Sequence, residues 1–176
     1  MNQIYRTYSE EVSSLFGIPI LVKPVHMTDI GPINSLDELC FPDDPEEEGD
    51  LLNEAFNNFD VSGIIAYQEK AAIGCILGRP GYLGFTDWFV GNQGRLIFNV
   101  AVHPNYQRKG LFNKLWTFYK KHHQAEYYFL DTRTEDNLHY NGVLIAYQKL
   151  GFEIIHTNLN IFHLDDPSCR MAIFEE

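Results

Sequence analysis

The run Val100 to Phe112, VAVHPNYQRKGLF, contains the residues of this 176-residue chain that are best suited to chemistry. It begins as an apolar strand, ends that strand at Pro104, and turns into a helix through polar residues and glycine. Such a turn directs backbone N–H groups outward at the positive end of the helix dipole, which favours a bound pyrophosphate. Arg108 and Lys109 add positive charge, and Gly110 permits a close approach that a side chain would obstruct. The alternative is an ordinary strand-to-helix turn with surface charges.

A second run, Ala146 to Phe152 (AYQKLGF), places a tyrosine on a predicted helix. The two runs resemble signatures of the GNAT acetyltransferase superfamily. Gln107 and Gly110 stand as in its Q/R-x-x-G-x-G/A loop, after a V-x-P strand end, and the second run resembles its L-Y-x-K-x-G-F segment. Phe112 departs from the pattern, because that family usually has glycine or alanine there, and its side chain either crowds the phosphates or points into the helix packing. The resemblance is specific over residues 96–152 and only architectural elsewhere.

The resemblance implies acetyl-coenzyme A as the cofactor, with its pantetheine arm inserted between two neighbouring strands that splay apart and pair with its amides. It also implies which residues contact that cofactor. They are Val100, Ala101, Val102, Gln107, Arg108, Lys109, Gly110, Leu111, Phe112, Asn113 and Asn137, with Asn141 as a rival of Asn137 because the connection between Asp136 and Asn141 is longer than usual. The implied activity is transfer of an acetyl group to a primary amine of a small molecule or a peptide N-terminus.

Acetylation of an amine needs a neutral amine, stabilisation of the oxyanion, and a proton for the departing thiolate. The resemblance assigns that proton to Tyr147, whose helix position is also compatible with a buried core aromatic. The family often has glutamate on the strand before the loop, where this chain offers Asn99, which cannot take a proton. Asp131, in the run LDTR, stands where acetylases of ribosomal-protein N-termini have a basic glutamate. It is either the base, directly or through water, or a strand-end acid paired with Arg133.

Composition limits the class of protein. The chain is 45% hydrophobic and 14% aromatic, enough to build a core, and it has no apolar run of membrane-spanning length. Its formal net charge of −11 disfavours nonspecific nucleic-acid binding, and it either favours a cationic partner or keeps the protein soluble. Three cysteines and seven histidines lack paired spacing, so neither disulfides nor a metal site is predicted. We expect a cytoplasmic protein without membrane partners, and a homodimer is compatible with the sequence.

Hydrophobic periodicity predicts one α/β (α+β) domain over 1–176, with a helical N-terminal extension over 1–17. The order of elements resembles the superfamily's mixed, mostly antiparallel sheet of about seven strands, with splayed middle strands and flanking helices. The expected helices lie around 8–16, 30–40, 44–59, 111–119 and 143–150, and the expected strands at 18–25, 61–67, 71–78, 95–102, 127–132 and twice after 152. The acidic run 43–50 is either a helix start capped by Asp44 or an electrostatic funnel for a cationic substrate.

The leading hypothesis is therefore an acetyltransferase that acts on a small amine or a peptide amine. The run Leu39 to Pro42 resembles the helix connection that lines the peptide site of N-terminal acetylases, and it slightly favours a peptide. The negative charge suits polyamines or aminoglycosides equally well. A non-catalytic acyl-coenzyme A sensor or regulatory domain is the alternative, given Asn99 and Phe112 at usually functional positions, and a purely structural interaction domain is the third reading.

Overall fold

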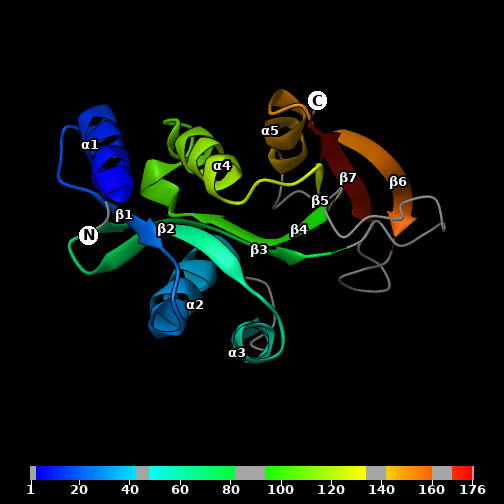
Figure 1. The fold of residues 1–176 in the computed structure, drawn as a ribbon, viewed down its shortest axis with the longest axis horizontal. Coiled ribbons are helices and arrows are strands. Elements are labelled where there is room, and N and C mark those ends of the chain that lie inside the picture. Colours follow the sequence, from blue (N-terminus) through cyan, green and yellow to red (C-terminus); the bar gives the residue numbers. More distant parts are fainter. Residues whose placement is uncertain (1–2, 43–47, 82–93, 134–141, 160–167, 176) are drawn as a thin grey trace. The chain divides into compact units, whose positions relative to one another are not determined.

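A computed structural model of the protein describes residues 3–42, 48–81, 94–133, 142–159 and 168–175 (Figure 1). The helices are α1 (Gln3–Phe16), α2 (Ile30–Cys40), α3 (Glu48–Asn58), α4 (Leu111–His122) and α5 (Val143–Lys149), and the strands are β1 (Leu21–Pro24), β2 (Ser62–Gln68), β3 (Ala71–Pro80), β4 (Gly94–Val102), β5 (Tyr127–Arg133), β6 (Glu153–Leu159) and β7 (Ser168–Phe174). None of the helices in these ranges is long and apolar enough to cross a membrane.

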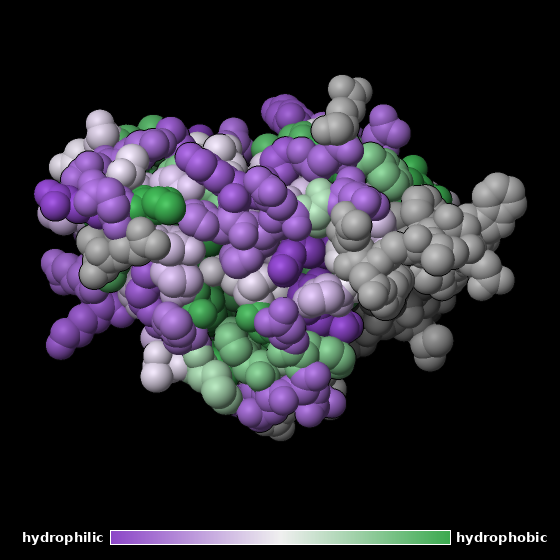
Figure 2. All heavy atoms as spheres, in the orientation of Figure 1, coloured by the Kyte–Doolittle hydropathy of each residue, from purple (hydrophilic) through white to green (hydrophobic). Residues whose placement is uncertain are grey.

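The strands form one seven-stranded sheet in the order β1-β2-β3-β4-β5-β7-β6. Strands β4 and β5 run parallel, with Gly94–Ile97 of the first paired to Tyr127–Leu130 of the second, whereas β1-β2, β2-β3, β5-β7 and β6-β7 are antiparallel. The predicted α/β fold, with a mixed and mostly antiparallel sheet and flanking helices, is confirmed. Most of the described surface visible in Figure 2 is hydrophilic, as expected for an acidic chain.

The chain forms two compact units, one of residues 1–79 and 99–124 and the other of residues 80–98 and 125–176. In the first unit, α1 and α4 cover one face of the strands and α2 and α3 cover the other (Figure 1). Strands buried on both faces need continuous apolar runs, and β3 has one, since every residue from Ala72 to Gly78 is buried. The single acetyltransferase domain expected over 1–176 stays a prediction.

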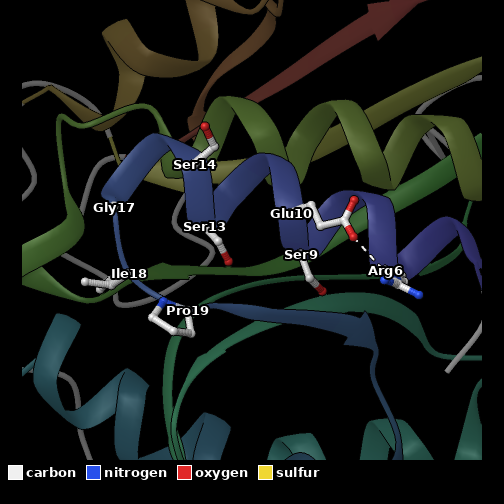
Figure 3. A pocket seen from close by; sticks show the side chains of 8 residues that line it. All are labelled: Arg6, Ser9, Glu10, Ser13, Ser14, Gly17, Ile18 and Pro19. Atoms are coloured by element: carbon white, nitrogen blue, oxygen red, sulfur yellow. Dashed lines mark hydrogen bonds and ion pairs between the residues drawn. The ribbon is translucent and has the colours of Figure 1, made fainter.

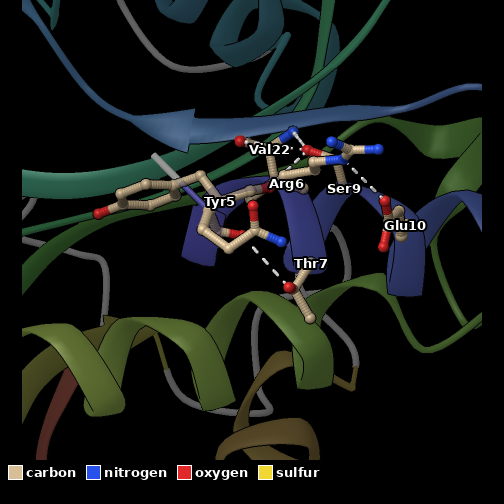
Figure 4. Close-up of polar contacts among 7 residues, drawn as sticks. Tyr5, Arg6, Thr7, Ser9, Glu10 and Val22 are labelled. Atoms are coloured by element: carbon tan, nitrogen blue, oxygen red, sulfur yellow. Dashed lines mark hydrogen bonds and ion pairs between the residues drawn. The ribbon is translucent and has the colours of Figure 1, made fainter. Parts of the chain in front are cut away.

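Helix α1 begins earlier than the sequence predicted, at Gln3, and ends as expected before Gly17, whose φ of +68° suits glycine. Two serines one turn apart on α1 bind the backbone of the neighbouring chain segment. The Ser9 hydroxyl accepts from the Val22 N–H at 2.8 Å (Figure 4), and the Ser13 hydroxyl accepts from the Ile20 N–H at 2.8 Å. Strand β1 is shorter than the predicted 18–25, because its pairing with β2 extends only from Leu21 to Pro24.

Two further predictions differ from the structure at the ends of elements. Phe59, expected on the apolar stripe of a helix, lies beyond the end of α3 at 46% exposure, with the Arg79 guanidinium 4.1 Å from its ring centroid. The ends of the loop expected over 79–94 belong to strands instead, since β3 continues to Pro80 and β4 begins at Gly94. The predicted helix cap at Asp44 lies outside the described residues.

The second unit contains β5, β6, β7, α5 and the first part of β4. Its sheet is held by the antiparallel pairing of β7 with both β5 and β6. Tyr127, Phe129 and Ala172 form a buried cluster against which Leu96 packs. The alternating residues Tyr128 and Leu130 are also buried, at 1% and 2% exposure, so β5 is buried on both faces. The two strands predicted after Phe152 are confirmed as β6 and β7.

Candidate active site

The predicted phosphate-binding turn joins β4 to α4 within the first unit. A short 3-10 turn, Pro104–Tyr106, follows the strand. The His103 N–H donates to the Ile73 carbonyl at 3.0 Å, which ties the strand end to β3, and the His103 ring nitrogen accepts from the Asn105 N–H at 3.1 Å. The chain therefore leaves the sheet at a fixed point before it reaches the basic residues.

Left-handed backbone conformations shape the rest of the turn. Gly110, at φ +88°, is the residue from which α4 begins, and Arg108 has φ +59°. The Lys114 N–H donates to the Gly110 carbonyl at 3.2 Å, so α4 makes its first helical hydrogen bond there. Helical geometry leaves the N–H groups of the first turn of α4 without a helical acceptor. An anion at Gly110 could accept from these donors, and the predicted role of Gly110 in binding phosphate stays a prediction.

The polar side chains of the turn divide into two kinds. Gln107 Nε2 donates to the Val102 carbonyl at 2.9 Å, and Lys109 Nζ donates to the Asn105 carbonyl at 2.8 Å. Both side chains are exposed but bind carbonyls of their own turn, so they brace its shape. Arg108 is also exposed, and within the described ranges its side chain has no hydrogen-bond or ion-pair partner. Of the predicted phosphate contacts, Arg108 is the cation best placed for a ligand.

The predicted apolar contacts differ in what they can offer a cofactor. Ala101 and Leu111 are buried in the protein core, at 1% and 0% exposure, and so can offer a ligand little beyond backbone atoms. Val100, Val102 and Phe112 are half-buried, and Asn113 is exposed. Asn137 and its rival Asn141 lie outside the described residues.

A hydrogen-bonded group surrounds Asn99 on β4, the position where the family resemblance predicted a base. Its Nδ2 donates to the Asp37 carboxylate at 2.8 Å, and the Cys75 thiol donates to its Oδ1 at 3.4 Å. Because a carboxylate only accepts hydrogen bonds, the Asn99 NH₂ must face Asp37, which fixes the orientation of the amide. The half-buried Asn99 side chain is thus held from both sides.

Asp37 is a buried carboxylate, at 4% exposure, that sequence reasoning missed. It lies on α2 one turn before Cys40, whose thiol donates to the Val102 carbonyl at 3.3 Å. Burial first, and then the Asp37 charge, raise the pKa of Cys40 to about 11 and the pKa of Cys75 well above its ordinary value. Both thiols therefore stay protonated near neutral pH and are not nucleophiles. The signal was available, because Asp37 interrupts the apolar stripe of a predicted helix.

Asp131, the predicted base, lies on β5 in the second unit. Its two oxygens accept from Nε and Nη2 of Arg170 at 2.7 and 2.8 Å, and both side chains are about 15% exposed. Arg170 lies directly opposite on β7. Sequence reasoning had named Arg133 as the partner, whose side chain lies outside the described part of the chain. Only the strand pairing reveals Arg170, since no sequence pattern links the two residues.

Tyr147, the predicted acid, is buried on α5 at 9% exposure. Its ring meets the ring of Phe152 edge-on, with centroids 5.7 Å apart. Burial raises the pKa of its phenol, so the hydroxyl keeps its proton at neutral pH and can donate it. The same packing would suit a core tyrosine, so both interpretations of Tyr147 stay open.

A hollow on the described surface lies away from this turn. It has a volume of about 590 Å³, and it lies between α1 and the start of β1 (Figure 3). Its lining residues are Arg6, Ser9, Glu10, Ser13, Ser14, Gly17, Ile18 and Pro19. None of them belongs to the turn before α4, so this hollow is not the predicted cofactor site.

A mostly antiparallel mixed sheet with flanking helices places the chain in the class of α/β proteins, and its basic, glycine-containing turn from strand to helix is suited to an anion. Comparison with known families identifies the particular one. The model of the acetyltransferase (GNAT) family matches residues 32–152, more than half of the chain. The chain therefore belongs to the acetyltransferase (GNAT) family, as the resemblance predicted.

Solved structures share the fold at low sequence identity. The ribosomal-protein-S18-alanine N-acetyltransferase from Escherichia coli superposes with a TM-score of 0.67 and 16% identity, over 88% of this chain and 93% of that chain. An aminoglycoside 6'-N-acetyltransferase complexed with coenzyme A superposes with a TM-score of 0.66 and 16% identity, over 88% of this chain and 96% of that chain. The aminoglycoside 6'-N-acetyltransferase from Enterococcus faecium superposes with a TM-score of 0.65 and 17% identity, over 88% of this chain and 96% of that chain. No curated protein sequence matches the chain.

Proposed function

We propose that this protein transfers an acetyl group from acetyl-coenzyme A to a primary amine, either of a small molecule or of a peptide N-terminus. One observation supports this most. The turn before α4 combines a left-handed Gly110, the first amides of a helix and an unpaired Arg108 within the described residues. Family membership supports coenzyme A as the ligand of this turn, because a similar fold is seen in an acetyltransferase complexed with coenzyme A.

The residues of the turn fit a pyrophosphate. A Cβ built on Gly110 would meet only Leu15, at 3.7 Å, so the space outside this glycine is open to a ligand. Arg108 would supply positive charge, and the amides of the first turn of α4 would donate hydrogen bonds. Gln107 and Lys109 would act by bracing the turn, since both bind its carbonyls. Acetyl-coenzyme A, when bound, supplies an acyl group activated as a thioester.

Two side chains of the second unit are assigned to proton transfer in this proposal. Tyr147 would protonate the departing thiolate, as the family resemblance implies. Burial keeps its phenol protonated at neutral pH and makes it a weaker acid than an exposed tyrosine. Asp131 would accept the proton of the amine, directly or through water, while Arg170 holds its carboxylate in place. The backbone N–H groups along β4 would offer donors for the oxyanion.

The acceptor is proposed at the level of chemical class. The names of similar structures include an alanine N-terminus of a ribosomal protein and aminoglycosides, all of them amines. A formal net charge of −11 favours a cationic acceptor and disfavours nucleic acid. Leu39, on the segment expected to line a peptide site, is 55% exposed and could contact one. We further propose a cytoplasmic location, and a homodimer stays compatible with the sequence.

A panel of amines tests the proposal against the sensor alternative. Free thiol is measured as acetyl-coenzyme A is incubated with the protein and with alanine-initiated peptides, polyamines or aminoglycosides. An acetyltransferase releases thiol only when a suitable acceptor is present. Acetyl-coenzyme A binding without acceptor-dependent release from any panel member would instead favour the regulatory domain.

A further inference from the structure

Helix α1 precedes the matched family region, which starts at residue 32, yet it contacts the proposed cofactor turn. The ring of Phe16 meets the ring of Tyr106 with centroids 5.2 Å apart at an interplanar angle of 67°. The Leu15 side chain lies against Gly110, since a Cβ there would be 3.7 Å from Leu15 Cδ2. The end of α1 therefore touches the turn at two positions.

The rest of α1 is fixed to the body of the same unit. Ser9 and Ser13 bind the segment of β1 through their hydroxyls. Figure 3 shows both side chains on α1, and Figure 4 shows the contact between Ser9 and Val22. On the face toward α4, Tyr8 stacks on Phe118 with ring centroids 3.7 Å apart, and Val12 is fully buried. An element held on two sides in this way can hold a third group in place.

Tyr106 connects α1 to the turn, because it belongs to the turn and its ring contacts Phe16. Its hydroxyl binds the Gln68 side chain at the end of β2, so the ring is held between α1 and the sheet. Its N–H donates to the His103 carbonyl at 2.8 Å, which fixes the backbone just before the left-handed residues. Arg108 adopts a left-handed conformation, φ +59°, that is strained for any residue other than glycine. Such backbone conformations persist only where surrounding contacts impose them.

We propose that Phe16 is a positioning residue for cofactor binding: through Tyr106 it holds the turn before α4 in the conformation that binds acetyl-coenzyme A. Leu15 assists by restricting Gly110. Affinity for the cofactor in this chain thus depends on a helix outside the matched family region. This inference rests on the proposed function of the turn.

The test compares Phe16→Ala with Val12→Ala, which removes buried volume from the same helix one helical turn before Phe16. Acetyl-coenzyme A affinity is measured by calorimetry well below both melting temperatures. We expect the Phe16 variant to bind about tenfold more weakly, with kcat at saturating cofactor little changed and KM raised. The Val12 variant should melt earlier and keep its affinity. Phe16→Tyr, which keeps the ring, should restore binding.

A double-mutant cycle tests whether Phe16 acts on the turn through its contact with Tyr106. Tyr106→Ala alone should weaken binding about as much as Phe16→Ala, and the double variant should add little, because the two changes break one contact. Unchanged affinity in Phe16→Ala, or an equal loss in Val12→Ala, would overturn the positioning role. Wild-type protein that does not bind acetyl-coenzyme A would overturn the proposed function itself, and the positioning role with it.

Discussion

Two helices of this protein start in the same way, one in each compact unit. Gly110 opens α4 at φ +88° and Gly142 opens α5 at φ +100°, and neither start has a side-chain cap. Only the first is preceded by adjacent basic residues and followed by a helix of three turns, whereas α5 has seven residues and includes the buried Tyr147. A left-handed glycine before a helix therefore does not identify a binding turn. The adjacent basic residues distinguish the turn before α4, to which the proposed function assigns cofactor binding, from the start of α5, the helix on which it assigns proton transfer to Tyr147.

The largest effect should come from the unit assigned to proton transfer. Tyr147→Phe removes only the hydroxyl, so turnover should fall on the order of 10²-fold or more while acetyl-coenzyme A affinity barely changes. The measurement is single-turnover thiol release with saturating acceptor, because slow product release could otherwise hide the defect. A full single-turnover rate with lowered stability would show that Tyr147 is a structural aromatic.

Asp131 offers the next test of the same unit. Asp131→Asn should lower turnover on the order of 10²-fold if this carboxylate takes the proton of the amine. Because the change also leaves Arg170 without its charged partner, the control is the double variant Asp131→Asn/Arg170→Gln, which removes both charges. If the double variant regains turnover, the pair is structural and the role of base is wrong.

The two glycines provide a matched pair. Gly110→Val and Gly142→Val both force a β-branched residue into a left-handed conformation, and a Cβ meets nothing closer than 3.7 Å at either position. Each should lose a similar stability, about 1–2 kcal/mol. Only the Gly110 variant should also bind acetyl-coenzyme A at least about tenfold more weakly, since its side chain obstructs the phosphates. Equal affinities in calorimetry would remove the turn from the cofactor site.

The smallest effect separates the two basic residues of the turn. Arg108→Ala should weaken binding several-fold and reduce its dependence on salt, because an exposed cation that contacts phosphate is screened by ions. Lys109→Ala should change affinity less, since its ammonium already binds the Asn105 carbonyl. Titrations at two ionic strengths measure both. A larger loss for Lys109 would reverse the assignment of these side chains.

Local patterns predicted the fold because helices and strands here follow their hydrophobic periods. The stripe Leu111, Leu115, Phe118 and Tyr119 is buried as predicted, and Gly17 ends its helix as predicted. Tertiary partners could not be predicted in this way. Arg170 meets Asp131 only because β7 pairs with β5, and Ser9 of α1 binds the backbone of β1 only because the two elements pack together.

The candidate site was predictable where chemistry is local in sequence. The turn at Arg108 and Gly110 has the backbone that the sequence required, because a strand end, a glycine and a helix start are all encoded within a few residues. Asp37 interrupts the apolar stripe of α2, but the sequence pattern does not reveal which residue its buried carboxylate contacts. Its contact with Asn99 joins residues from distant parts of the chain.

Binding of acetyl-coenzyme A to the unmodified protein tests the central claim most directly. In a calorimetric titration we predict saturable binding at one site per chain. A hundredfold excess over the dissociation constant should stabilise the fold by about 2.7 kcal/mol and raise the melting temperature. No heat of binding and no change in melting temperature at millimolar acetyl-coenzyme A would contradict the assignment of the turn before α4 as a cofactor site.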